Sequence, residues 1–355
     1  MSASGIILGI LALGFLIVVH ESGHYFVARW CKMRVERFSV GFGPGILKHK
    51  AKSGTTFQLA PIPFGGFVEI RGMNLAEEVD PDDAAAYPNR PAWQRFLTIL
   101  AGPVTNYVSA IFLAFALYTC EGMPGDTYYV GGTIEGLDAK GKLEPGDRII
   151  AVDGKTMISP SKAALSEAIN AKQGQPVTVS VLRGSVVVTK TLHPKLATDK
   201  AGKELLDDRN RRQYQIGVGL APDIVDVSTA TAARGAVRYP IEMTKAILGS
   251  LKDIFTGEGK ADPGSVVRIV KEFDIAFSRS FADGIGLLMM LSVYLGLFNL
   301  FPLPALDGGR LVFLTYELVT RRRANPKIET MVHMGGIMVL MVVLILVTLH
   351  DFNLI

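Results

Sequence analysis

The residues best suited to chemistry in this chain are His20, Glu21 and His24, which lie in the five-residue segment HESGH. Two histidines four residues apart share one face of a helix, so both imidazoles can bind a single Zn²⁺ ion. Glu21 can reach a water molecule at the metal without binding the ion itself, as a general base must. The chain has only six histidines, and this pattern is expected by chance about 0.005 times. The segment therefore predicts a catalytic metal site.

A catalytic zinc ion takes three protein ligands and keeps one position open, so a third ligand is needed. Asp307 follows Pro302 and Pro304, which end an apolar helix, and precedes two glycines, so its carboxylate can turn back toward HESGH. A plain interfacial residue at the start of a helix is the alternative for Asp307. His333 is geometrically possible as a ligand, although a packed or interfacial histidine explains it more simply. Asn299 either binds substrate or the tetrahedral oxyanion, or holds two helices together.

Four apolar segments can place these residues inside a membrane. Each is long enough to cross about 30 Å of hydrocarbon. The segments are residues 1–28, 96–120, 284–306 and 330–350. A composition of 49% hydrophobic and 20% charged residues excludes an ordinary soluble enzyme. The net charge of +4 does not indicate a nucleic-acid partner, because no basic run is interleaved with aromatic residues.

The positions of lysine and arginine predict the topology. The connections 29–95 and 307–329 are short and basic, and therefore cytoplasmic. Four spans then place both termini and the region 121–283 on the other side of the membrane. Cys31 and Cys120 would lie at opposite faces and stay free thiols.

Three further regions have recognisable patterns. Residues 126–221 contain short apolar runs separated by turn residues, which predicts a small β-rich domain with one short helix. Residues 222–283 form a linker with an amphipathic helix that lies against lipid or belongs to an ordinary protein surface. The stretch from about residue 55 to 73 is β-prone and unusually apolar. It either enters the membrane in the shelter of protein or a cavity, or forms a soluble hairpin.

Together these motifs resemble the site-2 protease family of intramembrane zinc metalloproteases, and most closely its bacterial regulator of sigma-E protease group. The matching segments are HESGH, PIPFGGFVEIRGM, AGPVTNYVSA, KLEPGDRIIAVDG and GLFNLFPLPALDGGR, in that order over nearly the whole chain. The resemblance implies a polytopic α-helical membrane protein with four transmembrane helices, a membrane re-entrant β-loop and one extracytoplasmic PDZ-like α+β domain. It also implies the bacterial inner membrane, with the active site near the cytoplasmic face.

The resemblance assigns roles to individual residues. It implies one Zn²⁺ per chain held by His20, His24 and Asp307, with Glu21 as the catalytic base and Asn299 in contact with substrate. The β-loop is expected to bind substrate as an added strand, which exposes scissile carbonyls that a helix would hide. Its substrate-binding residues would be Pro61, Ile62, Phe64, Gly65, Gly66 and Phe67.

The implied activity is cleavage of single-span membrane proteins within the bilayer, such as anti-sigma factors or remnant signal peptides. The PDZ-like domain would bind a peptide C-terminus or a substrate tail. Two features depart from the group. One PDZ-like domain fits here, where the best-known enterobacterial members have two, and VVRIVKEFDIAF (266–277) replaces an expected Gly-Pro-Ile type sequence.

Two other functions fit part of the sequence. A membrane-anchored metalloprotease acting on aqueous substrates would have its motif outside the spans and its third ligand from a downstream glutamate. A non-enzymatic scaffold could recruit partners through the PDZ-like domain, but it would have no need of Glu21.

Overall fold

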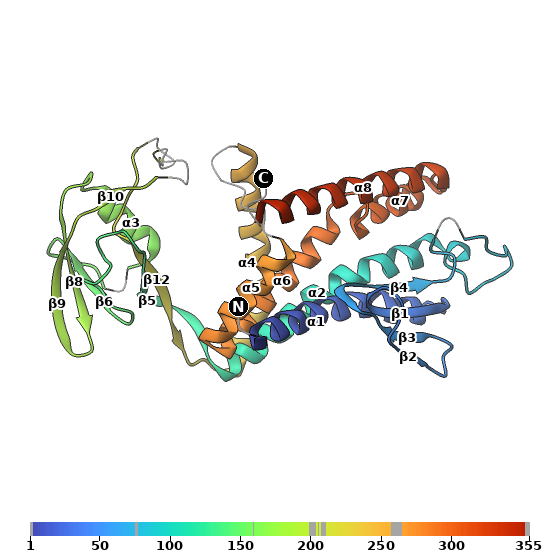
Figure 1. Cartoon of the computed structure of the whole chain (residues 1–355), viewed down its shortest axis with the longest axis horizontal. Coiled ribbons are helices and arrows are strands. Elements are labelled where there is room, and N and C mark those ends of the chain that lie inside the picture. Colours follow the sequence, from blue (N-terminus) through green and yellow to red (C-terminus); the bar gives the residue numbers. More distant parts are fainter. Residues whose placement is uncertain are drawn as a thin grey trace. The chain divides into compact units, whose positions relative to one another are not determined.

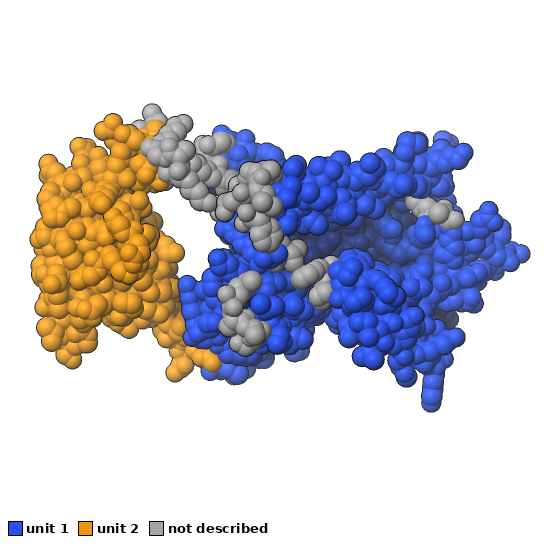
Figure 2. All heavy atoms as spheres, viewed as in Figure 1, with its two compact units in different colours: residues 1–120, 228–355 blue, residues 121–227 orange. Residues whose placement is uncertain are grey.

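The computed structural model describes residues 3–74, 77–158, 160–198, 204, 206, 211–256 and 265–351. The chain divides into two compact units (Figure 2). One unit consists of residues 1–120 and 228–355, and the other consists of residues 121–227. The smaller unit is therefore an insertion in the sequence of the larger one.

The larger unit is mainly helical (Figure 1). Its helices are α1 (Ala3–Trp30), α2 (Ala92–Cys120), α4 (Thr229–Thr256), α5 (Val266–Arg279), α6 (Phe281–Leu300), α7 (Asp307–Thr320) and α8 (Pro326–Asp351), with a 3-10 turn at Tyr87–Asn89. By length and composition, α1, α2, α6 and α8 can each cross a membrane. The prediction of four such segments is confirmed.

Pro302 and Pro304 end the helix of the third apolar segment, as the sequence predicted. α6 runs from Phe281 to Leu300, so it begins three residues before the apolar segment 284–306 and stops six residues before the end of that segment. Phe301 is extended, with φ −65° and ψ 142°. Helical backbone is disfavoured before a proline, and Pro302 and Pro304 follow, so the helix cannot continue. The region expected only as a cytoplasmic connection then begins with helix α7 at Asp307.

A four-stranded sheet lies between α1 and α2 in the sequence. Its strands are β1 (Val35–Phe42), β2 (Leu47–Lys50), β3 (Thr56–Leu59) and β4 (Ile62–Ile70), in the order β2-β3-β1-β4. β1 pairs in parallel with β3 and antiparallel with β4. Because β1 separates β3 from β4, residues 55–73 do not form a hairpin, and the entry of this segment into the membrane stays a prediction. The same order leaves β4 at one edge of the sheet.

Close packing holds the HESGH helix against α2. A Cβ atom on Gly23 would lie 2.2 Å from the carbonyl oxygen of Ala101, so only glycine allows this approach. Helix α5 packs on the other part of α1, where Phe273 is buried with Leu16. The segment that departs from the expected Gly-Pro-Ile type sequence is therefore an amphipathic helix that supports α1.

The described residues of the smaller unit form two main sheets and one helix. Its elements are β5 (Met123–Thr133), β6 (Arg148–Val152), β7 (Lys155–Thr156), α3 (Lys162–Asn170), β8 (Val177–Arg183), β9 (Val186–Leu192), β10 (Lys195–Leu196), β11 (Tyr214–Gln215) and β12 (Val218–Val225). The sheets have the orders β7-β6-β8-β9 and β12-β5, with β10 paired to β11.

An ion pair fastens the turn before β6 to the end of β8. Arg183 donates from Nε and Nη2 to Asp147, whose side chain is 1% exposed, at 2.8 and 2.7 Å. Burial by itself raises the pKa of Asp147, but hydrogen bonds from Arg183 and from the amide of Glu144 outweigh it and lower the pKa.

Candidate metal centre

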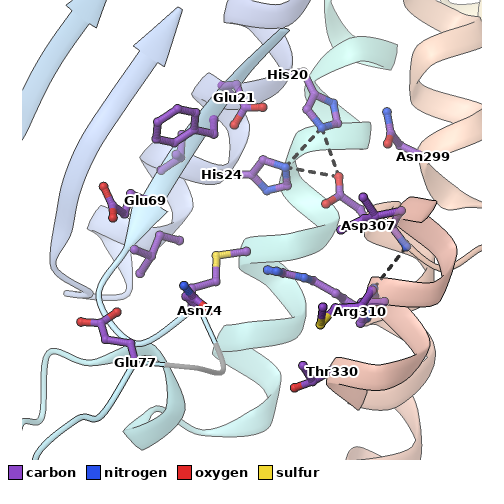
Figure 3. A pocket seen from close by; sticks show the side chains of 18 residues that line it. His20, Glu21, His24, Glu69, Asn74, Glu77, Asn299, Asp307, Arg310 and Thr330 are labelled. Atoms are coloured by element: carbon purple, nitrogen blue, oxygen red, sulfur yellow. Dashed lines mark hydrogen bonds and ion pairs between the residues drawn. The ribbon is translucent and has the colours of Figure 1, made fainter. Parts of the chain in front are cut away.

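Three predicted residues from opposite ends of the sequence converge at one point (Figure 3). Nε2 of His20 lies 3.1 Å from Oδ2 of Asp307, and Nε2 of His24 lies 3.3 Å from the same oxygen. The two Nε2 atoms are 3.3 Å apart. Within the described parts of the chain, this is the one cluster of three or more histidine, cysteine or acidic side chains close enough to hold a metal ion.

The spacing of these atoms fits a tetrahedral metal ion. Ligand atoms about 2.0–2.1 Å from a tetrahedral ion lie about 3.3–3.4 Å from one another. The observed triangle has sides of 3.1, 3.3 and 3.3 Å. Oδ2 of Asp307 is buried and lacks a well-directed hydrogen bond in the described structure. A cation shared by the three atoms would satisfy this oxygen, so the site fits the group that the sequence predicts.

Helix α2 fixes the orientation of both imidazole rings. Nδ1 of His24 donates to the carbonyl oxygen of Thr98 at 2.8 Å, which leaves Nε2 with its lone pair free for a metal. Nδ1 of His20 lies 3.0 Å from the side-chain amide of Asn106. An amide can present either its oxygen or its nitrogen. Metal binding at Nε2 of His20 requires the amide oxygen of Asn106 to face the ring, so that Nδ1 of His20 donates to it.

Thr98 and Asn106 were not among the predicted site residues, although the sequence contains a signal for them. Thr98, Gly102 and Asn106 are spaced by four residues and therefore lie along one face of α2. Two polar residues with a glycine between them, all on one face, are unusual within a largely apolar span. Such a pattern indicates that the face approaches another polar helix closely.

Gly102 is a second position of close approach between α1 and α2, and it leads to a prediction. A Cβ atom there would lie 2.3 Å from Nε2 of His24 and 3.0 Å from Cε1 of His20. We expect Gly102→Ala to displace the imidazoles and to lower metal affinity by about 10-fold or more. Metal content after dialysis, measured by atomic absorption, tests this. The matched control is Gly286→Ala in α6, where an added Cβ meets nothing within 4 Å; equal metal retention by both variants would contradict the prediction.

A cavity of about 540 Å³ opens beside the three converging atoms. Glu21, Asn299 and Phe67 line it, as do residues at the start of α8 (Figure 3). Glu21 faces the backbone amide of Val68 in β4. The cavity thus brings the predicted base, the predicted metal ligands and the edge strand β4 to one place.

Asn299 has no hydrogen bond that joins two helices in the described structure. Its Nδ2 donates to the carbonyl oxygen of Leu295, one turn earlier in the same helix, at 2.9 Å. The role of holding helices together therefore lacks support, and the second hydrogen of Nδ2 remains for another acceptor.

The predicted substrate-binding residues of the β-loop are distributed along β4. Phe67 lines the cavity, and Gly66 is so close to Ile17 that a Cβ atom would lie 2.6 Å from its Cγ2. Pro61 and Ile62 are exposed at the beginning of the strand and do not line the cavity. The remaining two are Gly65, which has φ +145°, and Phe64, whose side chain lies outside the described residues.

His333 is not part of the converging triangle. Its Nδ1 accepts a hydrogen bond from the amide of Ala305 at 3.2 Å, and Ala305 has a φ of +75°. His333 therefore supports the turn that precedes Asp307, and it is a packed residue in the described structure.

Comparison with known proteins identifies the family of the chain. The chain is 28% identical to a protein of Agrobacterium fabrum over 99% of this chain and 98% of that protein. It is 31% identical to one of Clostridium perfringens over 98% of each, and 29% identical to one of Mesorhizobium japonicum over 94% of each. All three carry the name "Putative zinc metalloprotease". The profile of peptidase family M50 matches residues 8–343. The chain, with its HESGH helix and distant aspartate, therefore belongs to peptidase family M50, the site-2 protease family.

Proposed function

We propose that this protein is a zinc metalloendopeptidase that cleaves single-span membrane proteins within the membrane. The observation that carries the proposal is the triangle formed by His20, His24 and Asp307 next to Glu21. Its histidines come from the interior of α1, a candidate span. Both conditions for the activity, a metal-binding donor set and a position among apolar helices, are therefore met by the same residues.

His20, His24 and Asp307 would hold one zinc ion per chain. When bound, zinc acts as a Lewis acid that polarises the scissile carbonyl and lowers the pKa of water. The carboxylate of Glu21 takes the proton of the attacking water and delivers it to the leaving amine. Asn299 is placed to donate a hydrogen bond to the oxyanion that develops on the carbonyl oxygen. The cavity supplies the water that hydrolysis consumes.

β4 is the element best placed to hold the substrate. One side of this strand pairs with β1, and the other side is an edge that can accept a further strand. The last four residues of β4 line the cavity. A substrate segment paired with this edge would be extended, with its carbonyl groups accessible next to Glu21.

Photocrosslinking tests the pairing with β4. A benzophenone amino acid replacing Phe67, in an inactive Glu21→Gln background, should crosslink to a model single-span substrate, because Phe67 lies at the proposed contact. The same probe replacing Leu47 in β2, the opposite edge of the sheet, is the matched control and should give no crosslink. Equal crosslinking from both edges, or none from position 67, would rule out strand addition at β4.

Removal of the metal tests the proposed function as a whole. Purified protein stripped with a chelator should lose cleavage of a model transmembrane substrate by about 100-fold or more, because the polarising ion is gone. One equivalent of zinc should restore cleavage, whereas Mg²⁺ should not, since imidazole ligands favour zinc. Cleavage is followed by mass spectrometry of the products. Undiminished turnover by protein shown to be free of metal would refute the proposal.

We further propose that the smaller unit is a PDZ-like domain that binds a peptide C-terminus or a substrate tail. A groove of about 300 Å³ lies between α3 and the segment from Tyr214 to Leu220, with Leu165 and Ile169 in its wall. A helix facing a strand is a geometry suited to an extended peptide. Such binding would regulate which membrane proteins reach the active site.

The proposed location is the inner membrane of a bacterium, with the smaller unit and both termini outside the cytoplasm. The basic residues of the short connections support this orientation. The bacterial origin of the relatives supports the class of organism. The proposed substrates are anti-sigma factors and remnant signal peptides, both of which have a single span.

An enzyme acting on aqueous substrates is less consistent with the site. It would take its third metal ligand from a glutamate on a soluble helix, but here the third atom of the triangle belongs to Asp307, just beyond the end of a candidate span. A non-enzymatic scaffold would not need Glu21 at the cavity.

A further inference from the structure

Helix α4 packs on the membrane-spanning helices without itself being a candidate span. Its buried residues, Ala232, Ala236, Pro240 and Ile247, form one face. Ile247 packs in a cluster with Ala110 of α2 and Val293 of α6. Thr244 forms a hydrogen bond with the hydroxyl of Tyr107 at 3.0 Å. The helix is thus firmly attached to α2 and α6 along one side.

Beside this buried face runs an apolar stripe that no described residue covers. Val237, Ile241, Leu248 and Phe255 are 53%, 53%, 44% and 81% exposed. Steps of four and seven residues keep them on one side of the helix. An ordinary water-facing helix surface would place polar residues in these positions.

A row of cations follows the stripe along its whole length. Arg234, Arg238, Lys245 and Lys252 each lie three residues before a member of the stripe, so each is its neighbour on the helix surface. All four are exposed. Arg238, Lys245 and Lys252 form no ion pair with any residue in the described ranges, so no described acid neutralises their charges.

The acidic residues of α4 lie on a different flank. Glu242 and Asp253 are the only acids in the helix, and both project further round from the stripe than the cations do. Going round the helix, one therefore meets the buried face, then the apolar stripe, then the cations and then the acids. This arrangement is typical of helices that lie in a membrane interface with their apolar side in lipid and their cations at the headgroups.

The neighbours of α4 indicate its depth. In the first half of α4, Tyr239 and Glu242 lie near Tyr118, which is two residues from the end of α2 at Cys120, whereas Ile247 packs beside Ala110, ten residues before that end. Tyrosines collect where a span meets the headgroup region. The helices on which α4 packs, α2 and α6, are themselves candidate spans and would be surrounded by lipid. The uncovered stripe of α4 would therefore face lipid as well.

We propose that α4 binds anionic phospholipids, with the stripe in the edge of the hydrocarbon and the four cations at the lipid headgroups. The unpaired cations complement the negative charge of these lipids. This interaction is separate from catalysis, since none of the eight residues lines the catalytic cavity.

The test uses the full-length protein with Leu248→Cys as the single cysteine, after Cys31→Ser and Cys120→Ser. A fluorophore at position 248 is quenched by spin-labelled lipid in reconstituted vesicles. Spin-labelled phosphatidylglycerol should quench at least about twofold more than spin-labelled phosphatidylcholine at equal mole fraction. The fourfold variant Arg234→Gln, Arg238→Gln, Lys245→Gln and Lys252→Gln should bring the ratio close to one.

A variant lacking the acids of the same helix, Glu242→Gln with Asp253→Asn, is the matched control and should keep the preference for phosphatidylglycerol. A salt titration of the wild-type protein provides a second measurement if the fourfold variant does not fold, and the preference should fall as salt rises. Equal quenching by the two lipids in the wild type would overturn the proposal. Weak quenching by both, as expected if another protein surface or the smaller unit covers the stripe, would also overturn it.

Discussion

Replacing Glu21 with glutamine should abolish proteolysis while the protein keeps its zinc. The amide is nearly the same size as the carboxylate, but it cannot take a proton from water. Loss of a general base costs about 10²- to 10⁴-fold in rate. Zinc content should not change, because the converging triangle consists of atoms from His20, His24 and Asp307. The measurements are turnover of a model transmembrane substrate and metal content of the same preparation.

Glu69→Gln is a suitable control for this experiment. Glu69 also lines the cavity and is also acidic, but its side chain pairs with Arg37 at 3.1 Å, and the proposed pairing with substrate uses the backbone of β4, which this variant leaves unchanged. We expect this variant to keep most of the activity. Near wild-type turnover in Glu21→Gln would contradict the proposed role of Glu21 as general base. Loss of zinc in that variant would instead show that Glu21 acts as a ligand.

Replacing Asp307 with asparagine should weaken both zinc binding and cleavage. Oδ2 of Asp307 lies 3.1 and 3.3 Å from the two histidine nitrogens, and its negative charge is part of the donor set. A neutral amide is a much poorer zinc ligand, so we expect affinity to fall by about 100-fold or more. Competition with a chelator of known affinity measures the change, and substrate cleavage should fall in parallel.

The simpler role for Asp307 is that of an acid in the first turn of α7. An acid in that position stabilises a helix by only about 0.3–1 kcal/mol, and its loss would leave zinc in place. Asp283→Asn is the matched control, because Asp283 occupies the first turn of α6. If both variants bind zinc as the wild type does, Asp307 is a helix-start residue and the proposed site lacks its third ligand.

Local spacing in the sequence carried much of the information about the site. His20 and His24 share a helix face because they are four residues apart in an apolar helix, and this relation does not depend on the rest of the fold. The four apolar segments follow from length and composition in the same way. Asp307 could be proposed because prolines and glycines allow the chain to turn at that point, although its approach to the histidines required packing of α6 and α7 against α2.

Other parts of the site depend on contacts between elements. Nothing local shows that Asn106 and the carbonyl of Thr98 orient the two imidazoles, or that Gly102 provides the room for them. The edge position of β4 could not be predicted either, because it results from β1 lying between β3 and β4 in the sheet.

The sequence by itself thus determined the apolar helices, the paired histidines with their neighbouring glutamate, and the turn that precedes Asp307. The tertiary structure decided which residues hold the imidazoles, which strand edge borders the cavity, and that Asp307 meets the two histidines. The physical reason is that helix periodicity and backbone restrictions act over a few residues. Contacts between distant residues are selected by how whole surfaces fit together, which no short pattern encodes.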